Sequence, residues 1–250
     1  MTRKPAYGVF LVVMAAGLFV VNAGVSRVAL RAGVEPSTLT SIRVTGTLAL
    51  LVLVAILFRP SALAFPRGKL AALVVAHGLV GVAALQWLYF VAIERLPVGV
   101  ALLLEYLAPL LVALWARFVQ QEAVHNRMWL GLGLALAGLA ATTGVWDGLR
   151  FDGLGVIAGL GAACCFAAYF LIGEVGVNTY DPLRVVVWSF VVATVVLNVV
   201  APLTGLEPAL GADVTLLGRY AEHAVPLWGA LVWIVVLGTV IPFVAELLAL

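Results

Sequence analysis

The sequence predicts an all-α integral membrane protein, a polytopic helix bundle of about eight transmembrane helices. Of its 250 residues, 64% are apolar and only 10% are charged, and the mean hydropathy is +1.18. A soluble domain has roughly 45–50% apolar and about 25% charged residues, so this chain has too little polar surface to cover a soluble body. Its apolar runs recur between short charged breaks, and most exceed the roughly 18 residues that indicate a spanning helix.

Five apolar runs make up the first part of the chain. The first follows Arg3 and Lys4 and is long for a signal peptide, so we expect it to be a span. All five are too long for strands, and none alternates polar with apolar residues as a membrane barrel does. The expected spans are Tyr7–Ala29, Ser37–Phe58, Leu70–Ile93, Val98–Ala116 and Met128–Trp146.

Three further runs follow, and they resemble the first three in order. Gly8–Asn22 resembles Gly155–Tyr169, Glu35-Pro36 recurs as Asp181-Pro182, and Gly81–Ile93 aligns with Gly238–Leu250. The first unit has an odd number of spans, so the second begins on the opposite side of the membrane and the repeats are inverted, which is a transporter architecture. The expected spans of the second repeat are Gly153–Gly173, Val185–Leu203 and Leu227–Leu250.

The repeat divides the chain into two predicted domains. Residues 1–147 form a first repeat of five spans, and residues 148–250 form a second repeat that holds only three. By symmetry a complete protein has ten helices, so we expect this chain to be truncated and to transport poorly. A natural eight-helix protein is the alternative.

Basic residues predict the orientation of the spans. With a cytoplasmic N-terminus, eight Lys and Arg residues fall on the inner side and five on the outer side. The positive-inside rule then places both termini in the cytoplasm and residues 204–226 outside. The expected location is the inner, cytoplasmic membrane.

Several function classes are excluded by what the sequence lacks. A net charge of +2 is too small to indicate a nucleic-acid partner. Cys164 and Cys165 are adjacent, which fits neither a disulfide across a long loop nor a zinc site. There is no Gly-x-Ser-x-Gly, no His-Glu-x-x-His and no Walker loop. We therefore expect no enzyme activity, no metal and no cofactor, and uphill transport must use an ion gradient, such as a proton gradient, or a separate partner.

Short strings along nearly the whole chain resemble the EamA family of the drug/metabolite transporter superfamily. They include Arg43, Ala92, Leu96-Pro97-Val98-Gly99-Val100-Ala101, Pro109, Trp129-Leu130-Gly131 and Gly238-Thr239. Two others are similar to the threonine/homoserine exporter branch, namely Leu104-Glu105-Tyr106 with Pro109, and Ile241-Pro242-Phe243 with Glu246. The resemblance implies a ten-helix secondary transporter that moves an amino acid or related amphipathic solute outward, with Pro109 and Pro242 shaping their helices.

Two ionisable residues inside spans are the first candidates for a substrate or proton site. A charge within hydrocarbon is costly and usually faces the bundle interior or a water-filled cavity. Glu105 and Arg43 each lie six or seven residues from the outer end of a span, so roughly 9–10 Å deep. Glu105 could bind a substrate amine or carry a proton, or be a structural acid. Arg43 could anchor a substrate carboxylate, or only neutralise Glu105 or extend outward to water.

Other polar residues within the spans are weaker candidates. They can hydrogen-bond a substrate, carry a proton or simply hold helices together. This group consists of Asn22, His77, Gln86, Tyr89 and Glu246. Rows of small residues, by contrast, predict close helix packing, and the two rows are Gly155, Gly159, Ala163 and Ala167, and Gly133, Ala137 and Ala141.

The sequence therefore favours a secondary transporter whose partners are a small-molecule substrate and the lipid bilayer. The alternative from another class is a non-transporting membrane remnant or helper subunit that arose by truncation. The sequence leaves the substrate, the coupling ion and the oligomeric state undetermined.

Overall fold

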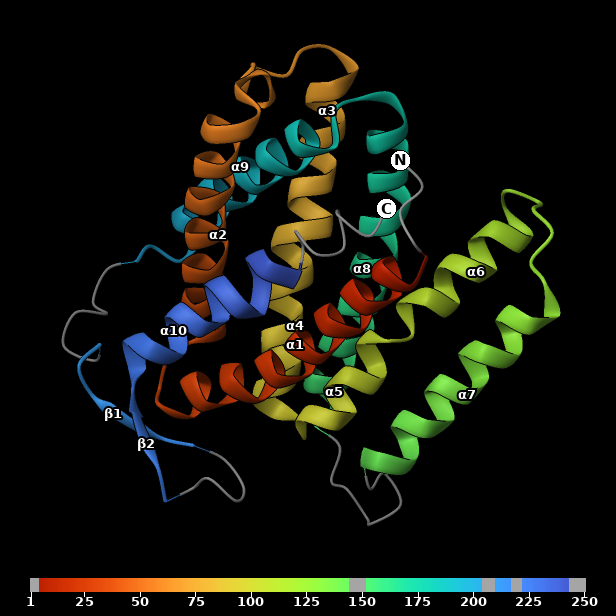
Figure 1. Ribbon diagram of the computed structural model, residues 1–250. Coiled ribbons are helices and arrows are strands. Elements are labelled where there is room, and N and C mark those ends of the chain that lie inside the picture. Colours follow the sequence, from red (N-terminus) through yellow and green to blue (C-terminus); the bar gives the residue numbers. More distant parts are fainter. Residues whose placement is uncertain (1–4, 144–151, 204–209, 217–221, 243–250) are drawn as a thin grey trace. The chain divides into compact units, whose positions relative to one another are not determined.

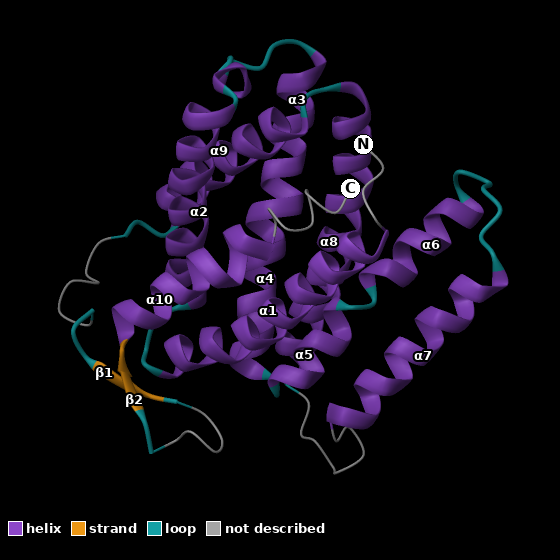
Figure 2. Cartoon of the chain, in the orientation of Figure 1, coloured by secondary structure: helices purple, strands orange, loops and turns teal. Residues whose placement is uncertain are grey.

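A computed structural model describes residues 5–143, 152–203, 210–216 and 222–242. Helices make up most of this part of the chain (Figure 2). Its strands, β1 (Asp213–Thr215) and β2 (Ala224–Pro226), pair antiparallel with Val214 opposite Val225. The predicted all-α membrane class is thus confirmed, with a short antiparallel strand pair in the segment 204–226 that the sequence placed outside.

The helices follow one another along the chain, and β1 and β2 lie between α9 and α10 (Figure 1). Two π-helical segments interrupt longer helices: η2 (His77–Ala84) joins α3 to α4, and η4 (Val236–Val240) continues α10. A short 3-10 helix, η1, covers Pro60–Leu63. The α-helices are α1 (Pro5–Arg31), α2 (Pro36–Phe58), α3 (Lys69–Ala76), α4 (Leu85–Arg95), α5 (Val98–Glu105), α6 (Ala108–Phe118), α7 (Asn126–Thr143), α8 (Gly153–Thr179), α9 (Pro182–Val200) and α10 (Leu227–Val235).

Six helices among the described residues are long and apolar enough to cross a membrane. They correspond to six of the eight expected spans. The fifth expected span is helical as α7, and the eighth is the shorter apolar helix Leu227–Val240. The six are Val13–Arg31, Pro36–Phe58, Lys69–Arg95, Val98–Phe118, Gly153–Thr179 and Pro182–Val200.

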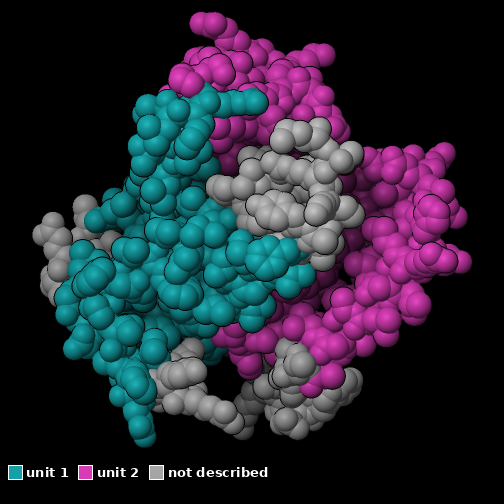
Figure 3. Space-filling model, in the orientation of Figure 1, with its two compact units in different colours: residues 1–59, 197–250 teal, residues 60–196 magenta. Residues whose placement is uncertain are grey.

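Two compact units divide the chain, and both combine helices from its two halves (Figure 3). Unit 1 comprises Met1–Arg59 and Leu197–Leu250, and unit 2 comprises Pro60–Val196. The chain passes from unit 2 to unit 1 within α9. The units therefore do not coincide with the predicted repeats 1–147 and 148–250.

In unit 1, α10 and η4 pack against both α1 and α2. The end of α9 is tied to α2 by polar side chains. Ser41 Oγ donates to the carbonyl of Leu197 or Ala201, at 3.2 and 3.0 Å, and Asn198 Nδ2 donates to Thr45 Oγ1 at 2.9 Å. Such bonds satisfy polar groups that lipid cannot solvate.

In unit 2, α8 is the central helix and packs against α3, η2, α4, α5 and α6. Its small residues allow this close approach, as the sequence predicted for Gly155, Gly159, Ala163 and Ala167, all of which are buried. A Cβ added at Gly159 would lie 2.7 Å from Leu104 Cδ1, so a larger residue there would push α5 away.

The packing predicted for the second row of small residues is wrong within the described chain. Gly133, Ala137 and Ala141 on α7 are exposed, and nothing lies within 4 Å of a Cβ added at Gly133. The row has the same spacing as the row on α8, but no described helix covers it.

Candidate functional site

Asn22 and Gly238 are in direct contact within unit 1. Asn22 lies on α1, is 2% exposed, and its Oδ1 has no hydrogen-bond partner among the described residues. A Cβ added at Gly238 on η4 would overlap the Asn22 amide, so the contact requires glycine. A buried amide oxygen without a partner is costly and is a natural acceptor for a bound ligand.

Arg43 reaches the same segment of η4 from α2. Its Nε donates to Thr239 Oγ1 at 2.7 Å, and its Nη2 donates to the Gly238 carbonyl at 3.3 Å. Arg43 is 6% exposed, so it does not extend outward to water. Thr239 Oγ1 in turn donates to the Ile234 carbonyl at 2.9 Å, which leaves it as the acceptor for Arg43.

Pro242 explains why the Gly238 carbonyl is free to accept from Arg43. In an α-helix this carbonyl would accept from the N–H of residue 242, and proline has none. Pro242 is buried in the turn that follows η4, where the Ile241 N–H bonds to the Val236 carbonyl five residues back. The Arg43 guanidinium therefore donates to a carbonyl that, in a regular α-helix, would accept from a backbone N–H.

His77 is a buried basic side chain of unit 2. It is 3% exposed at the start of η2, and its Nδ1 lies 2.9 Å from Ser189 Oγ on α9. Its ring lies against Tyr169 on α8, with centroids 4.7 Å apart and planes tilted by 32°. A π-helical segment is frequently found at a functional site; Arg43 bonds to η4, and His77 is the first residue of η2.

Gln86 and Tyr89 lie one turn apart on α4 in unit 2. They are 7% and 6% exposed. Gln86 Oε1 has no hydrogen-bond partner among the described residues, whereas Tyr89 packs its ring 5.6 Å from that of Phe90. Gln86 is therefore an available acceptor inside the unit.

Glu105 is the last residue of α5, where the fourth expected span is interrupted. Tyr106 and Leu107 form a turn before α6, and Pro109 stands in the first turn of α6. Pro109 cannot donate to the Glu105 carbonyl four residues earlier, which accounts for the break. Glu105 is half-buried in unit 2 while Arg43 belongs to unit 1, so their pairing stays a prediction. Glu246 lies outside the described residues.

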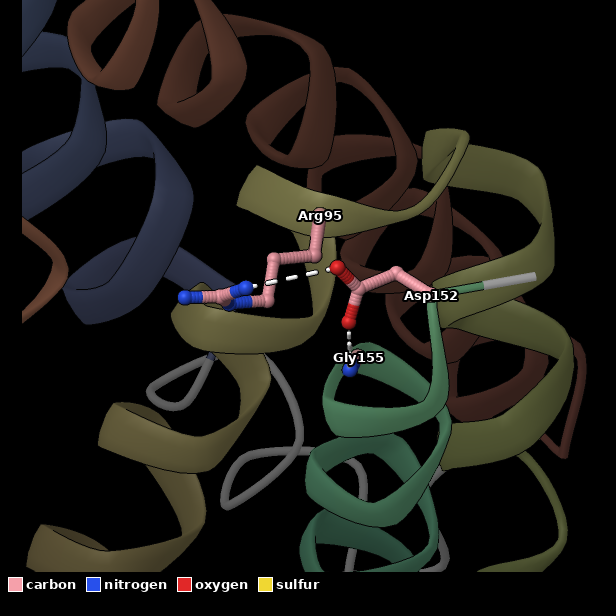
Figure 4. A network of polar contacts seen from close by, with 3 residues as sticks. All are labelled: Arg95, Asp152 and Gly155. Atoms are coloured by element: carbon pink, nitrogen blue, oxygen red, sulfur yellow. Dashed lines mark hydrogen bonds and ion pairs between the residues drawn. The ribbon is translucent and has the colours of Figure 1, made fainter. Parts of the chain in front are cut away.

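Arg95 and Asp152 form an ion pair at the end of α4 and the start of α8 (Figure 4). Arg95 Nη1 lies 3.3 Å from Asp152 Oδ2, while Asp152 Oδ1 accepts from the Gly155 N–H at 2.9 Å and caps α8. The Gly155 hydrogen bond, with a smaller contribution from Arg95, lowers the pKa of Asp152. This pair fixes the start of the central helix of unit 2.

Sequence reasoning missed the two hydroxyl partners, Thr239 and Ser189. Both are fully buried and are hydrogen-bonded to candidate residues, Thr239 to Arg43 and Ser189 to His77. Each is a small polar residue inside an apolar run. Such a residue is only a weak indication of a functional partner, because serine and threonine are common within membrane helices.

The fold and its buried polar side chains indicate the class of the protein. Long apolar helices, an interrupted span and buried polar side chains at helix irregularities are typical of membrane transporters. The sequence profile of the EamA-like transporter family matches residues 6–144, more than half of the chain. The chain therefore belongs to the EamA-like transporter family, which is a transporter family and not a class of enzymes.

Curated relatives agree with this assignment at modest identity. The threonine/homoserine exporter RhtA of Escherichia coli K12 is 27% identical over 180 residues, covering 68% of this chain and 52% of that protein. RhtA of Salmonella typhimurium LT2 is 29% identical over 145 residues, covering 55% and 44%. The uncharacterized transporter YwfM of Bacillus subtilis is 27% identical over 114 residues, covering 45% and 38%. The matches thus span about half the length of these relatives or less, and the predicted resemblance to the exporter branch is confirmed.

A solved crystal structure shares the fold. It aligns with a TM-score of 0.64 at 19% sequence identity, covering 94% of this chain and 77% of that chain. At this identity the likeness concerns the fold alone.

Proposed function

We propose that the chain is a secondary transporter that exports a small zwitterionic solute, an amino acid or a close relative, across the cytoplasmic membrane. The observation that carries the proposal is the group at Gly238 in unit 1. An amide oxygen of Asn22 that has no partner among the described residues and a buried guanidinium of Arg43 both contact this one residue. An amino acid carries the complementary pair, an ammonium that donates and a carboxylate that accepts.

The roles of the two side chains follow from their chemistry. Arg43 can exchange its bond to the Gly238 carbonyl for a bond to a substrate carboxylate, since a charge-assisted bond is the stronger one. Asn22 Oδ1 can accept from the ammonium. The name of the RhtA relatives supports threonine or homoserine as the first solutes to test and outward movement as the direction.

The inverted-repeat organisation, residues 1–147 and 148–250, belongs to the same proposal. In the register of the repeats, Asn22 and Gly238 correspond to Tyr169 and Gly81. A Cβ at Gly81 would lie 3.1 Å from Tyr169 Cα, so the first helix of one repeat packs closely on a glycine of the third helix of the other in both units. Cytoplasmic termini and an external segment 204–226 complete the proposed topology.

Binding of labelled threonine to the purified chain in lipid nanodiscs tests the proposal. We expect threonine to bind and its methyl ester to bind at least about tenfold more weakly, because loss of about 1.4 kcal/mol in a charge-assisted bond is tenfold. N-acetylthreonine has no ammonium, and we expect it to bind more weakly than threonine by a similar factor. If the three compounds bind equally, or none binds, the proposed site is wrong.

Gly238→Ala is the matched structural test. Its methyl group would overlap the Asn22 amide, so threonine binding is expected to be lost. Gly229→Ala on α10 is the control, because a Cβ there lies 3.7 Å from the nearest atom, a ring carbon of Pro226. Normal binding by Gly238→Ala would show that Asn22 does not contribute to the site.

A further inference from the structure

The hydrogen bonds around Ser189 determine which nitrogen of His77 carries its hydrogen. Ser189 Oγ lies 2.7 Å from the Val185 carbonyl and 2.9 Å from His77 Nδ1. The carbonyl can only accept, so the single hydroxyl proton of Ser189 is used there. Ser189 must then accept from His77, and the hydrogen of the neutral imidazole is on Nδ1.

The second nitrogen of His77 is therefore a basic lone pair, and it is buried. His77 Nε2 has no hydrogen-bond partner among the described residues. Gly173 on α8 leaves space beside it, since a Cβ added there would lie 3.4 Å from Nε2. An unpaired acceptor at a residue that is 3% exposed is a feature that needs a cause, because nearly all buried polar groups are paired.

The Tyr169 ring favours a positive charge on His77, whereas burial of the ring opposes it. The tilted Tyr169 ring, with its centroid 4.7 Å away, lies within the roughly 6 Å over which an aromatic face attracts a cation. Glu174 of α8 is exposed, and Arg184 of α9 is bonded to the Ala64 and Phe65 carbonyls. The remaining charges on the elements around the ring lie at the ends of the helix that contains His77, and they are Lys69, Glu94 and Arg95.

We propose that His77 binds the proton that drives transport, and that Nε2 is the atom that takes it up. The step is a proton transfer from a hydronium ion to the Nε2 lone pair, which breaks one O–H bond, leaves a water molecule and changes the ring from neutral to singly positive. The Nδ1 hydrogen stays in its bond to Ser189. The link to transport rests on the proposed function, whereas the binding of a proton does not.

Nitrogen NMR of the ring tests proton binding without any transport assay. The other two histidines, His125 and His223, are exposed and can be replaced by glutamine, which leaves His77 as the labelled residue in nanodiscs. At about pH 8 we expect the Nδ1–H tautomer, and on lowering the pH toward about 4 we expect the doubly protonated ring. An Nε2–H tautomer, or a ring that stays neutral throughout, would overturn the proposal.

Gly173→Ala tests whether the space beside Nε2 is the route of protonation. Its methyl group occupies that space, so protonation of His77 is expected to require a lower pH. Gly153→Ala on the same helix is the control, because nothing lies within 4 Å of a Cβ there. An identical titration in Gly173→Ala and Gly153→Ala would contradict the assignment of Nε2.

His77→Asn tests the link to transport. The asparagine amide can donate to Ser189 as Nδ1 does, but it cannot take up a proton. A gradient of one pH unit, coupled to one proton, supports about tenfold accumulation of the solute. In proteoliposomes we expect the unchanged chain to accumulate threonine in this way, at the low rate expected of it, and His77→Asn to equilibrate it without accumulation.

The two proposals fail in distinguishable ways. If the unchanged chain neither binds nor moves threonine, the proposed function fails, and the NMR titration alone decides whether His77 binds a proton. If His77→Asn still accumulates threonine in response to the pH gradient, the coupling role of His77 is overturned while the transporter assignment stands.

Discussion

Gly46 on α2 packs against Val235 on α10 with no space for a side chain of its own: a Cβ added at Gly46 would lie 2.8 Å from Val235 Cγ1. Unit 2 contains a contact of the same kind, in which a Cβ at Gly78 would lie 2.9 Å from Val192 Cβ. In the register of the repeats, Gly46 corresponds to Val192 and Val235 to Gly78. In unit 1 the glycine lies on the second helix of a repeat and the valine on the third, whereas in unit 2 the glycine lies on the third and the valine on the second. This exchange supports the inverted-repeat proposal.

The first prediction concerns this contact. Gly46→Ala should lower the free energy of unfolding by about 1–3 kcal/mol, the usual cost of overpacking. Gly46→Ala with Val235→Ala should recover part of that loss, because the two Cγ atoms that would clash are removed. Thermal unfolding in detergent measures both, with Gly24→Ala, which meets nothing within 4 Å, as the control. Equal stability of the single and double variants would argue against a direct contact.

A second prediction concerns Arg43 and Glu105. Glu105→Gln keeps the shape of the side chain and removes its charge, and in the ten-helix version that the repeat predicts we expect it to abolish threonine export while membrane insertion is unchanged. If the two residues only neutralise each other, Arg43→Gln combined with Glu105→Gln should recover the export lost in each single variant. If Glu105 contacts the substrate or a proton, the double variant should stay inactive. Near-normal export by Glu105→Gln alone would make the acid structural.

The third prediction concerns the Asp152 cap of α8. The folded-state pKa of Asp152 is depressed below its ordinary value of 3.8, so its ionised form stabilises the fold above that pH. This contribution is lost as the pH falls from 3.8 through the folded-state pKa. Asp152→Asn should therefore lower the unfolding temperature at pH 7 and reduce the difference between pH 7 and about pH 3.

Glu35→Gln is the control for Asp152. Glu35 is also an N-cap, on α2, but its side chain makes no capping hydrogen bond. Its replacement should leave the unfolding temperature and its pH dependence nearly unchanged. A shift as large as that of Asp152→Asn would mean that net charge, and not the cap, causes the effect.

The fourth prediction concerns topology. The connection between α6 and α7 carries Arg117 at the end of α6 and Arg127 near the start of α7, and the positive-inside rule places it in the cytoplasm. A single cysteine at position 122, in a background without Cys164 and Cys165, should resist a membrane-impermeant thiol reagent in intact cells and react after permeabilisation. Labelling from outside would invert the proposed orientation.

The sequence by itself determined the class of the protein, the order of its helices and its family. Hydropathy and run length suffice for these, because the lipid environment requires long apolar helices and backbone that bonds within each helix. The same local signals placed Pro109 and Pro242 inside apolar runs, where a missing N–H must alter the helix.

Only the tertiary structure decided which polar groups meet. It brought Arg43 to Thr239 and Gly238, and His77 to Ser189, across 196, 195 and 112 positions of sequence. It also covered the small residues of α8 and left those of α7 exposed, although both rows have the same spacing. Spacing fixes the face of a helix on which a residue lies, but which neighbour covers that face depends on contacts between segments far apart in the chain.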